Sequence, residues 1–283
     1  MKNLPASGYA VATVFMWSSL AALTVQINSL PPLLMLAVSL TCASGLSVHH
    51  FRQWRAPLKD WAIGLLGIFG YHWLLFSALT QAPAVNANLV QYSWPLLIVI
   101  GSTLMQANSH FTKTTLMAII LGIGGLMLAL ANNLAAFQTQ HIKGYLFAIA
   151  AAFAWASYSL LNAKRSNQST GLIGGFCFVG AIIAWLSLYI GTPSFSIATV
   201  TTQQWLVMLA LGFGPMGLAF YTWDIAMKKG DAKFNGTLCY ATPVLSTLFI
   251  LIVAQEPLTL HLAIAVTLVT ISGIVAAKER NNG

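Results

Sequence analysis

Apolar stretches long enough to cross a lipid bilayer recur along the whole chain. A membrane-spanning helix needs about 20 apolar residues. Ten segments meet this length, at residues 6–26, 30–49, 61–80, 84–105, 114–132, 144–163, 171–191, 204–226, 234–254 and 258–277. They lack the two-residue alternation of barrel strands, so only helices can satisfy their backbone in lipid. The pattern predicts an all-α integral membrane protein with ten transmembrane helices.

The fourth of these segments carries polar residues in its middle. Asn88, Gln91, Tyr92 and Pro95 follow the spacing i, i+3, i+4, i+7, and therefore share one helical face. Polar groups at bilayer depth are costly, and they usually face a cavity or another helix. Proline removes a backbone hydrogen bond, so we expect Pro95 to kink this span. The stretch is typical of a wall that lines a substrate path.

The same arrangement returns in the ninth segment. Tyr240 and Pro243 stand 148 positions after Tyr92 and Pro95. The repeated spacing predicts a second copy of the wall, with a second kink at Pro243. The two copies are expected to face each other.

A second match lies near the start of each half. The sequence MWSSL around Trp17 resembles AWASY around Trp155, at an offset of 138. Five spans is an odd number, so two five-helix halves must lie in opposite orientation. Inverted repeats with a substrate site at the midplane are common in transporters. The sequence therefore predicts two inverted five-helix repeats, at residues 1–140 and 141–283, around a central cavity.

Composition and charge support a membrane protein and give its orientation. The chain is 58% hydrophobic and 6% charged, whereas soluble domains have about 25% charged residues. With a cytoplasmic N-terminus, twelve basic residues fall on the inner side and only Lys143 falls outside. The positive-inside rule then predicts that both termini are cytoplasmic. The net charge of +8 is explained by this topology, so no nucleic-acid partner is expected, and lipid is the expected surroundings.

Motifs for cofactor or metal chemistry are missing from the sequence. It contains no phosphate loop, CxxC or HExxH, so we expect no cofactor and no metal. A membrane enzyme would need paired acids or a nucleophile motif, and a purely structural subunit would not need a duplicated polar midplane. None of the five acids occupies the middle of a span. Proton relays usually place acids there, which favours facilitated movement, with a histidine-coupled antiport as the alternative.

Polar and aromatic residues deep in the spans are the candidates for substrate contact. The histidine in GYHW, His72, could bond a neighbouring helix or contact substrate. Deep aromatics could pack in the core, face lipid or line the cavity, where flat rings stack on a planar solute. The candidate substrate-binding residues are Trp17, Tyr71, His72, Asn88, Gln91, Tyr92, Trp94, Trp155, Tyr158 and Tyr240.

The chain also resembles a known family. Ten spans, paired halves, and the motifs VQYSWPLL, FYTWDIAMKKGD and YATPVLST resemble the EamA-like branch of the drug/metabolite transporter superfamily, and within it the bacterial aromatic amino acid exporters. The resemblance implies an inner-membrane exporter of phenylalanine, tyrosine and tryptophan that works by alternating access. It also implies that a histidine in the third helix belongs to the cavity. Exporters of other amino acids, of the threonine, homoserine or cysteine type, are the alternative within the superfamily.

Overall fold

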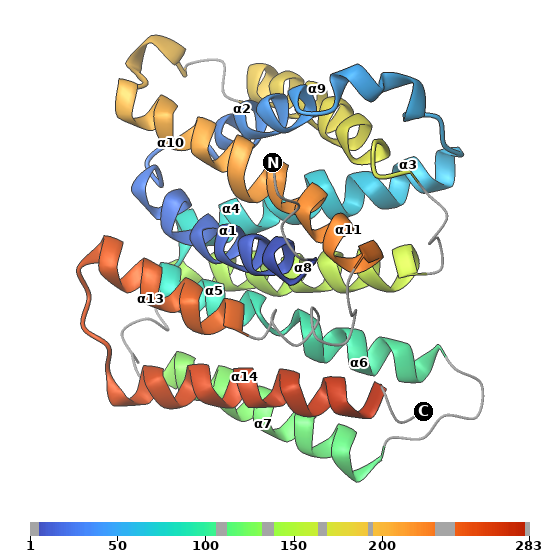
Figure 1. Ribbon diagram of the computed structural model, residues 1–283. Helices are drawn as coiled ribbons and strands as arrows, with labels where there is room; N and C mark the ends of the chain where they lie inside the picture. The colour runs from blue at the N-terminus through green and yellow to red at the C-terminus, as the bar shows by residue number, and fades with distance from the viewer. Residues whose placement is uncertain are drawn as a thin grey trace.

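Helices account for nearly all of the described chain. The computed structural model describes residues 6–105, 112–131, 139–163, 169–191, 195–229 and 241–280. Figure 1 shows the helices stacked along similar directions, with α7 and α14 at one edge of the molecule and α2 with α9 at the opposite edge. The helical class predicted from the sequence is confirmed.

The helices before residue 132 follow the predicted spans closely. They are α1 (Ala6–Gln26), α2 (Pro32–Gly45), α3 (Leu58–Leu65), α4 (Tyr71–Gln81), α5 (Ala84–Gln91), α6 (Trp94–Leu104) and α7 (Lys113–Ala131). The second span is shorter than predicted. It begins after Pro31, which together with Pro32 suits the first turn of a helix, and it is followed by a short 3-10 helix, η1 (Val48–Gln53).

The helices of the second half repeat this series. They are α8 (Thr139–Ala163), α9 (Leu172–Gly191), α10 (Thr202–Phe213), α11 (Ala219–Lys229), α13 (Thr242–Ala254) and α14 (Leu260–Arg280). The short 3-10 helix η4 (Ile197–Thr199) precedes α10. A capping box between Thr201 and Gln204 sets the start of α10, because each side chain satisfies a backbone N–H of the other residue.

Several of these helices suit a membrane by length and composition. Among the described residues, five apolar helices are long enough to cross one, at Gly8–Gln26, Leu58–Gln81, Thr139–Leu161, Leu172–Gly191 and Thr202–Trp223. Shorter apolar helices include Pro32–Gly45 and Thr242–Ala254. Large apolar side chains such as Phe15, Ile120, Ile190 and Ile252 are exposed on the outside of the bundle. A surface of this kind is stable against lipid and would be a liability in water.

Two long helices contain a π-helical turn at matching places. The turn η2 (Leu66–Gly70) joins α3 to α4, and the turn η5 (Gly214–Leu218) joins α10 to α11. The two turns are 148 positions apart, the same offset that relates Tyr92 to Tyr240. Turns of this type are rare and often lie at functional sites.

A glycine inside each turn permits a close approach. A methyl group on Gly67 would overlap the ring of Tyr158 in α8, and one on Gly217 would overlap the carbonyl oxygen of Gly212. Both positions therefore require glycine unless a neighbouring group shifts.

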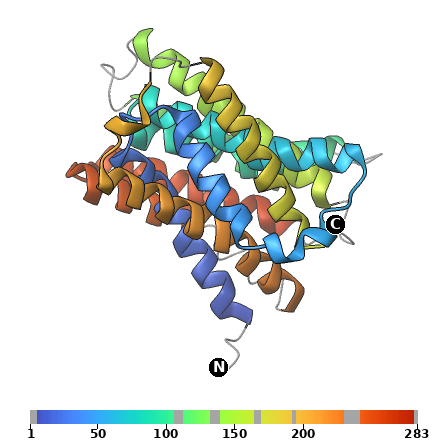
Figure 2. The ribbon, with the colours of Figure 1, turned by 90° about the horizontal axis from the view of Figure 1, so that it is seen from above.

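Helices of the two halves pack against each other in pairs. The most extensive contacts join α7 with α14, α2 with α9, α4 with α8, and α1 with both α11 and α13. In the first pair, Ser272 of α14 donates a 2.7 Å hydrogen bond to the carbonyl of Ala118 in α7. Figure 2 shows the same bundle from above.

The fourth span is interrupted where the sequence places its proline. Helix α5 ends at Gln91 and α6 begins at Trp94, so Tyr92 and Ser93 lie between two helical pieces directly before Pro95. In the ninth span Pro243 occupies the first turn of α13. Residues 230–240 lie outside the described part of the chain, and the expected substrate contact Tyr240 is one of them.

Candidate functional site

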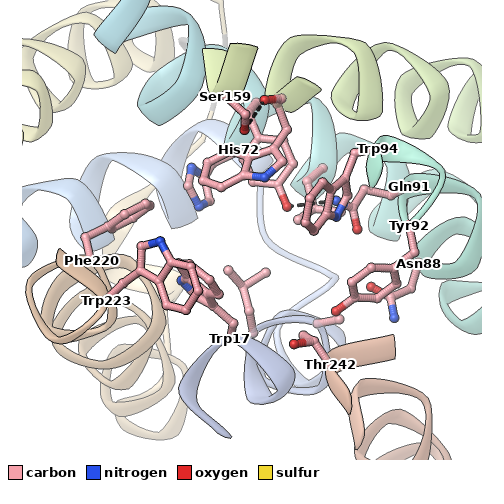
Figure 3. Close-up of a pocket in the computed structure, with 15 residues that line it drawn as sticks. Trp17, His72, Asn88, Gln91, Tyr92, Trp94, Ser159, Phe220, Trp223 and Thr242 are labelled. Carbon is pink, nitrogen blue, oxygen red and sulfur yellow. Dashed lines mark hydrogen bonds between the residues drawn. The ribbon is translucent and has the colours of Figure 1, made fainter. Parts of the chain in front are cut away.

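A cavity of about 180 Å³ lies in the middle of the bundle. Its wall is built by helices from both halves of the chain. The lining residues are Trp17, Leu20, Ala21, Tyr71, His72, Leu75, Asn88, Gln91, Tyr92, Trp94, Trp155, Ser159, Phe220, Trp223 and Thr242. Figure 3 shows these side chains converging on a common space. The cavity is large enough for several water molecules or one small solute.

Most of the residues singled out in the sequence meet at this cavity. They are Trp17, Tyr71, His72, Asn88, Gln91, Tyr92, Trp94 and Trp155. Tyr158 lies outside the lining: its ring covers Gly67 in the η2 turn, with its centroid 5.4 Å from the ring of Trp155. The reason is helical geometry, because a side chain three positions from Trp155 can lean toward a neighbouring helix instead of the cavity.

Four aromatic rings form a box on one side of the cavity. Trp17 of α1 lies 5.4 Å from Trp223, 6.1 Å from Phe220 and 6.4 Å from Trp155, measured between ring centroids. The rings of Trp155 and Phe220 are 6.3 Å apart. We call these four residues the aromatic box. Rings at these distances stabilise one another by edge and tilted contacts, and their faces can stack on a planar solute.

Trp155 connects the box to the rest of the cavity. Its ring centroid lies 4.8 Å from that of Tyr71 and 6.4 Å from that of Trp94. Trp155 therefore contacts rings from both halves of the chain, and a change at this position alters several contacts together.

His72 lies at the edge of the aromatic box with a defined tautomer. Its Nδ1 is 2.7 Å from the carbonyl oxygen of Ile68, in the η2 turn. A carbonyl only accepts, so Nδ1 carries the proton and Nε2 is left as an acceptor. The ring contacts Tyr71 and Phe220, at 4.7 and 6.1 Å between centroids. His72 is thus bonded within its own helix, and not to a neighbouring helix as considered from the sequence, and it also lines the cavity.

Two buried amides line the opposite wall. Asn88 of α5 donates from Nδ2 to Oγ of Ser246 in α13, at 3.0 Å, which joins the two halves of the chain. Gln91, one turn along, donates from Nε2 to the hydroxyl of Tyr71 at 2.9 Å. Each amide therefore has a protein partner for its nitrogen, and its carbonyl oxygen is an acceptor at the cavity wall. We call this side the polar wall.

Seven lining residues were not among the sequence candidates, and these are Leu20, Ala21, Leu75, Ser159, Phe220, Trp223 and Thr242. Phe220, Trp223 and Thr242 line the cavity from α11 and α13. They stand 148 positions after His72, Leu75 and Trp94. The 148-residue offset could have found Phe220 and Thr242 from the candidates His72 and Trp94, whereas Trp223 pairs with Leu75, which was not a candidate. Residue type gave no such signal, since Phe220 and Thr242 look ordinary in an apolar span.

Comparison with known proteins agrees with this architecture. The model of the EamA-like transporter family matches the chain twice, at residues 4–131 and 142–277.

The chain belongs to the EamA-like transporter family.

One relative and one solved structure cover nearly the whole length of this transporter. It is 34% identical over 288 residues to the aromatic amino acid exporter YddG of Ancylobacter novellus, covering 98% of each chain. It is 23% identical to the aromatic amino acid exporter YddG of Salmonella typhimurium over 190 residues, covering 64% of this chain and 63% of that one. A solved crystal structure with 33% identity superposes with a TM-score of 0.75 over 98% of both chains.

Family membership decides the broad class of activity. The protein is a multi-pass integral membrane transporter and not an enzyme. The cavity has residues from both halves of this transporter in its wall.

Proposed function

We propose that this transporter exports aromatic amino acids, phenylalanine, tyrosine and tryptophan, across the bacterial inner membrane. The observation that carries the proposal is the aromatic box beside a buried polar wall in one central cavity. Flat rings with polar edges suit a solute that has an aromatic side group and a polar head. The whole-length similarity to a protein described as an aromatic amino acid exporter supports the same substrate class.

Alternating access is supported by a second hollow one helical turn away from the cavity. It has a volume of about 670 Å³ and lies at the ends of α1, α4 and α13. On α4, Leu75 lines the cavity and Leu79 lines the second hollow. On α5, Asn88 lines the cavity and Val85 lines the second hollow. One turn of helix is about 5.4 Å long. A thin layer that contains the Asn88–Ser246 hydrogen bond therefore separates the two spaces, and its opening would connect them.

The repeat proposal is two inverted five-helix halves, at residues 1–140 and 141–283, with ten spans in all. The two family matches, the paired packing of α2 with α9 and α7 with α14, and the π turns 148 positions apart support it. Movement would be facilitated, down the substrate gradient. Of the acids with described side chains, Asp60 lies in the first turn of α3 and Glu256 in the connection after α13, so neither is deep in a span.

The orientation proposal, with both termini in the cytoplasm, rests on the distribution of basic residues. Alkaline phosphatase fusions report periplasmic positions, and fluorescent protein fusions report cytoplasmic ones. Fusions at Gly283 and after Lys59 should be cytoplasmic, and a fusion near Thr199 should be periplasmic. A periplasmic C-terminus would contradict the ten-span arrangement.

The substrate is tested by export in cells and by flux in liposomes. Cells that overproduce the protein should resist toxic analogues of phenylalanine and tryptophan, and purified protein in liposomes should release preloaded radiolabelled phenylalanine. Resistance confined to analogues of threonine, homoserine or cysteine would instead identify an exporter of those amino acids. Empty liposomes and liposomes with the Trp155→Ala variant serve as controls.

A further inference from the structure

The cavity presents chemically different surfaces at its two ends. Figure 3 shows Phe220 and Trp223 on one side, and Asn88, Gln91 and Tyr92 on the other. Building on the proposed function, we propose that the solute binds in one orientation. Its ammonium and carboxylate groups meet the polar wall, where the hydroxyl of Thr242 donates to the carboxylate, and its side group enters the space beside Phe220 and Trp223.

Thr242 is the observation that first points to a bound head group. The residue is 94% buried and lines the cavity, and its hydroxyl oxygen is itself almost fully covered and has no hydrogen-bond partner. A buried hydroxyl left without a partner costs roughly 1–3 kcal/mol, so such groups in native proteins usually have a purpose. A solute carboxylate in the cavity would supply the missing partner.

The polar wall extends from Thr242 along α13 and across to α5. Thr242 and Ser246 are four positions apart, and therefore lie on the same face of α13. The Asn88–Ser246 hydrogen bond fixes α5 beside this face. Asn88 and Gln91 are three positions apart on α5 and both line the cavity. The wall thus offers a hydroxyl donor and two amide oxygens that can accept from an ammonium group.

The aromatic box cannot provide the same bonds. Phenylalanine has no hydrogen-bonding group and an indole only donates, so the rings of Phe220, Trp17 and Trp223 offer an ammonium group no acceptor. The two charged groups of an α-amino acid are attached to the same carbon atom, and they must therefore contact the same wall of the cavity. Burying a charge without hydrogen bonds is expensive, which places the head at the polar wall and leaves the box for the side group.

The test pairs variants of the two walls with solutes that lack one part. Inhibition of phenylalanine exchange in liposomes is measured for phenylalanine, tryptophan, leucine, phenethylamine (no carboxylate) and 3-phenylpropionate (no ammonium). Thr242→Val removes the hydroxyl and keeps the shape. It should raise the inhibition constant of phenylalanine and 3-phenylpropionate roughly tenfold or more, and leave that of phenethylamine within about twofold.

Matched variants separate this effect from damage to the fold. Thr247 is on the same helix, is buried, and also has a hydroxyl without a partner, but it does not line the cavity. Thr247→Val should leave all five constants unchanged, and Thr242→Ser should remain close to wild type. Trp223→Ala should reduce the preference for tryptophan over leucine severalfold, while the ratio of phenylalanine to phenethylamine stays constant.

Three results would overturn this assignment. Thr242→Val could weaken phenethylamine and phenylalanine equally, or have no larger effect than Thr247→Val. Trp223→Ala could weaken every solute that has an ammonium group and spare 3-phenylpropionate, which would identify the box as a cage for the ammonium group. If no aromatic solute inhibits exchange by the wild-type protein, the proposed function itself is wrong. This result needs no variant, so it is distinguishable from a failure of the orientation proposal.

Discussion

The two halves of the transporter use the same backbone device with different side chains. In the first half the π turn η2 is followed by His72 and Leu75, and in the second half η5 is followed by Phe220 and Trp223 at the equivalent positions. All four side chains line the cavity. The helix geometry that places them has been kept, and the chemistry that they present has changed.

This difference teaches how a scaffold with two similar halves can hold an asymmetric solute. Related helix pairs need similar backbones, because close approaches such as those at Gly67 and Gly217 permit few alternatives. Side chains at the cavity can diverge where they border open space, because a change there need not be matched by a packing partner. One half then supplies the acceptor of His72, and the other half supplies Phe220 and Trp223 for the aromatic box. Four experiments would break or sharpen this comparison.

The largest effect is expected at Trp155, where rings of both halves meet. Trp155→Ala removes contacts with Trp17, Tyr71, Trp94 and Phe220. Each aromatic pair stabilises by about 0.5–1.5 kcal/mol, so phenylalanine flux in liposomes should fall to about a tenth or less.

Trp185→Ala is the matched control for Trp155→Ala. Trp185 donates to Oγ1 of Thr41 between α9 and α2, away from the cavity. The control should retain most of the phenylalanine flux when the same amount of protein is reconstituted into the liposomes. Equal losses in both variants would mean that the cavity rings only support the fold.

The π turns are compared by adding a methyl group to each. Gly217→Ala would press on the carbonyl of Gly212, a backbone group that cannot turn away, whereas Gly67→Ala would press on the movable ring of Tyr158. Overpacking costs typically 1–3 kcal/mol. Thermal unfolding in detergent should show a larger loss of Tm for Gly217→Ala, and the Tyr158→Ala change should rescue Gly67→Ala. A loss that is larger at Gly67 would contradict this ranking.

His72→Phe makes the first half resemble the second. The variant loses the Nε2 acceptor beside the aromatic box and the bond to Ile68. The half-saturation concentration should rise severalfold for tyrosine and tryptophan, whose side groups carry an O–H or N–H donor, and change less for phenylalanine, because a neutral hydrogen bond contributes roughly 0.5–1.5 kcal/mol. His72→Gln keeps hydrogen-bonding capacity and should recover part of the affinity. If the Phe and Gln variants behave alike, the ring of His72 acts by shape alone.

The smallest effect is expected at the bond that joins the halves beside the cavity. Asn88→Ala and Ser246→Ala, singly and together, form a double-mutant cycle on the 3.0 Å hydrogen bond. The coupling energy in detergent stability should be about 0.5–1.5 kcal/mol. The same cycle on Thr13 and Thr222, whose hydroxyls are 2.7 Å apart between α1 and α11, gives the comparison. A coupling energy of zero at Asn88 and Ser246 would show that this bond does not hold the halves together.

Sequence patterns were enough to place the helices and one wall of the cavity. Length and apolarity decide membrane helices, and the spacing of Asn88, Gln91, Tyr92 and Pro95 identified a polar face because polar residues in lipid are rare. The same argument found His72. The break between α5 and α6 lies directly before Pro95, since a proline weakens the helix on its N-terminal side.

The second wall was decided only by the tertiary structure. In a membrane helix apolar side chains face both the lipid and the protein interior, so residue type does not reveal which face is inside. Phe15 is 59% exposed and Phe220 only 6%, although both are phenylalanines in apolar spans. Tyr158 was expected beside Trp155 at the cavity and instead covers Gly67. The π turns, which reset the direction of every side chain after them, depend on packing against neighbouring helices and have no signature in the apolar pattern.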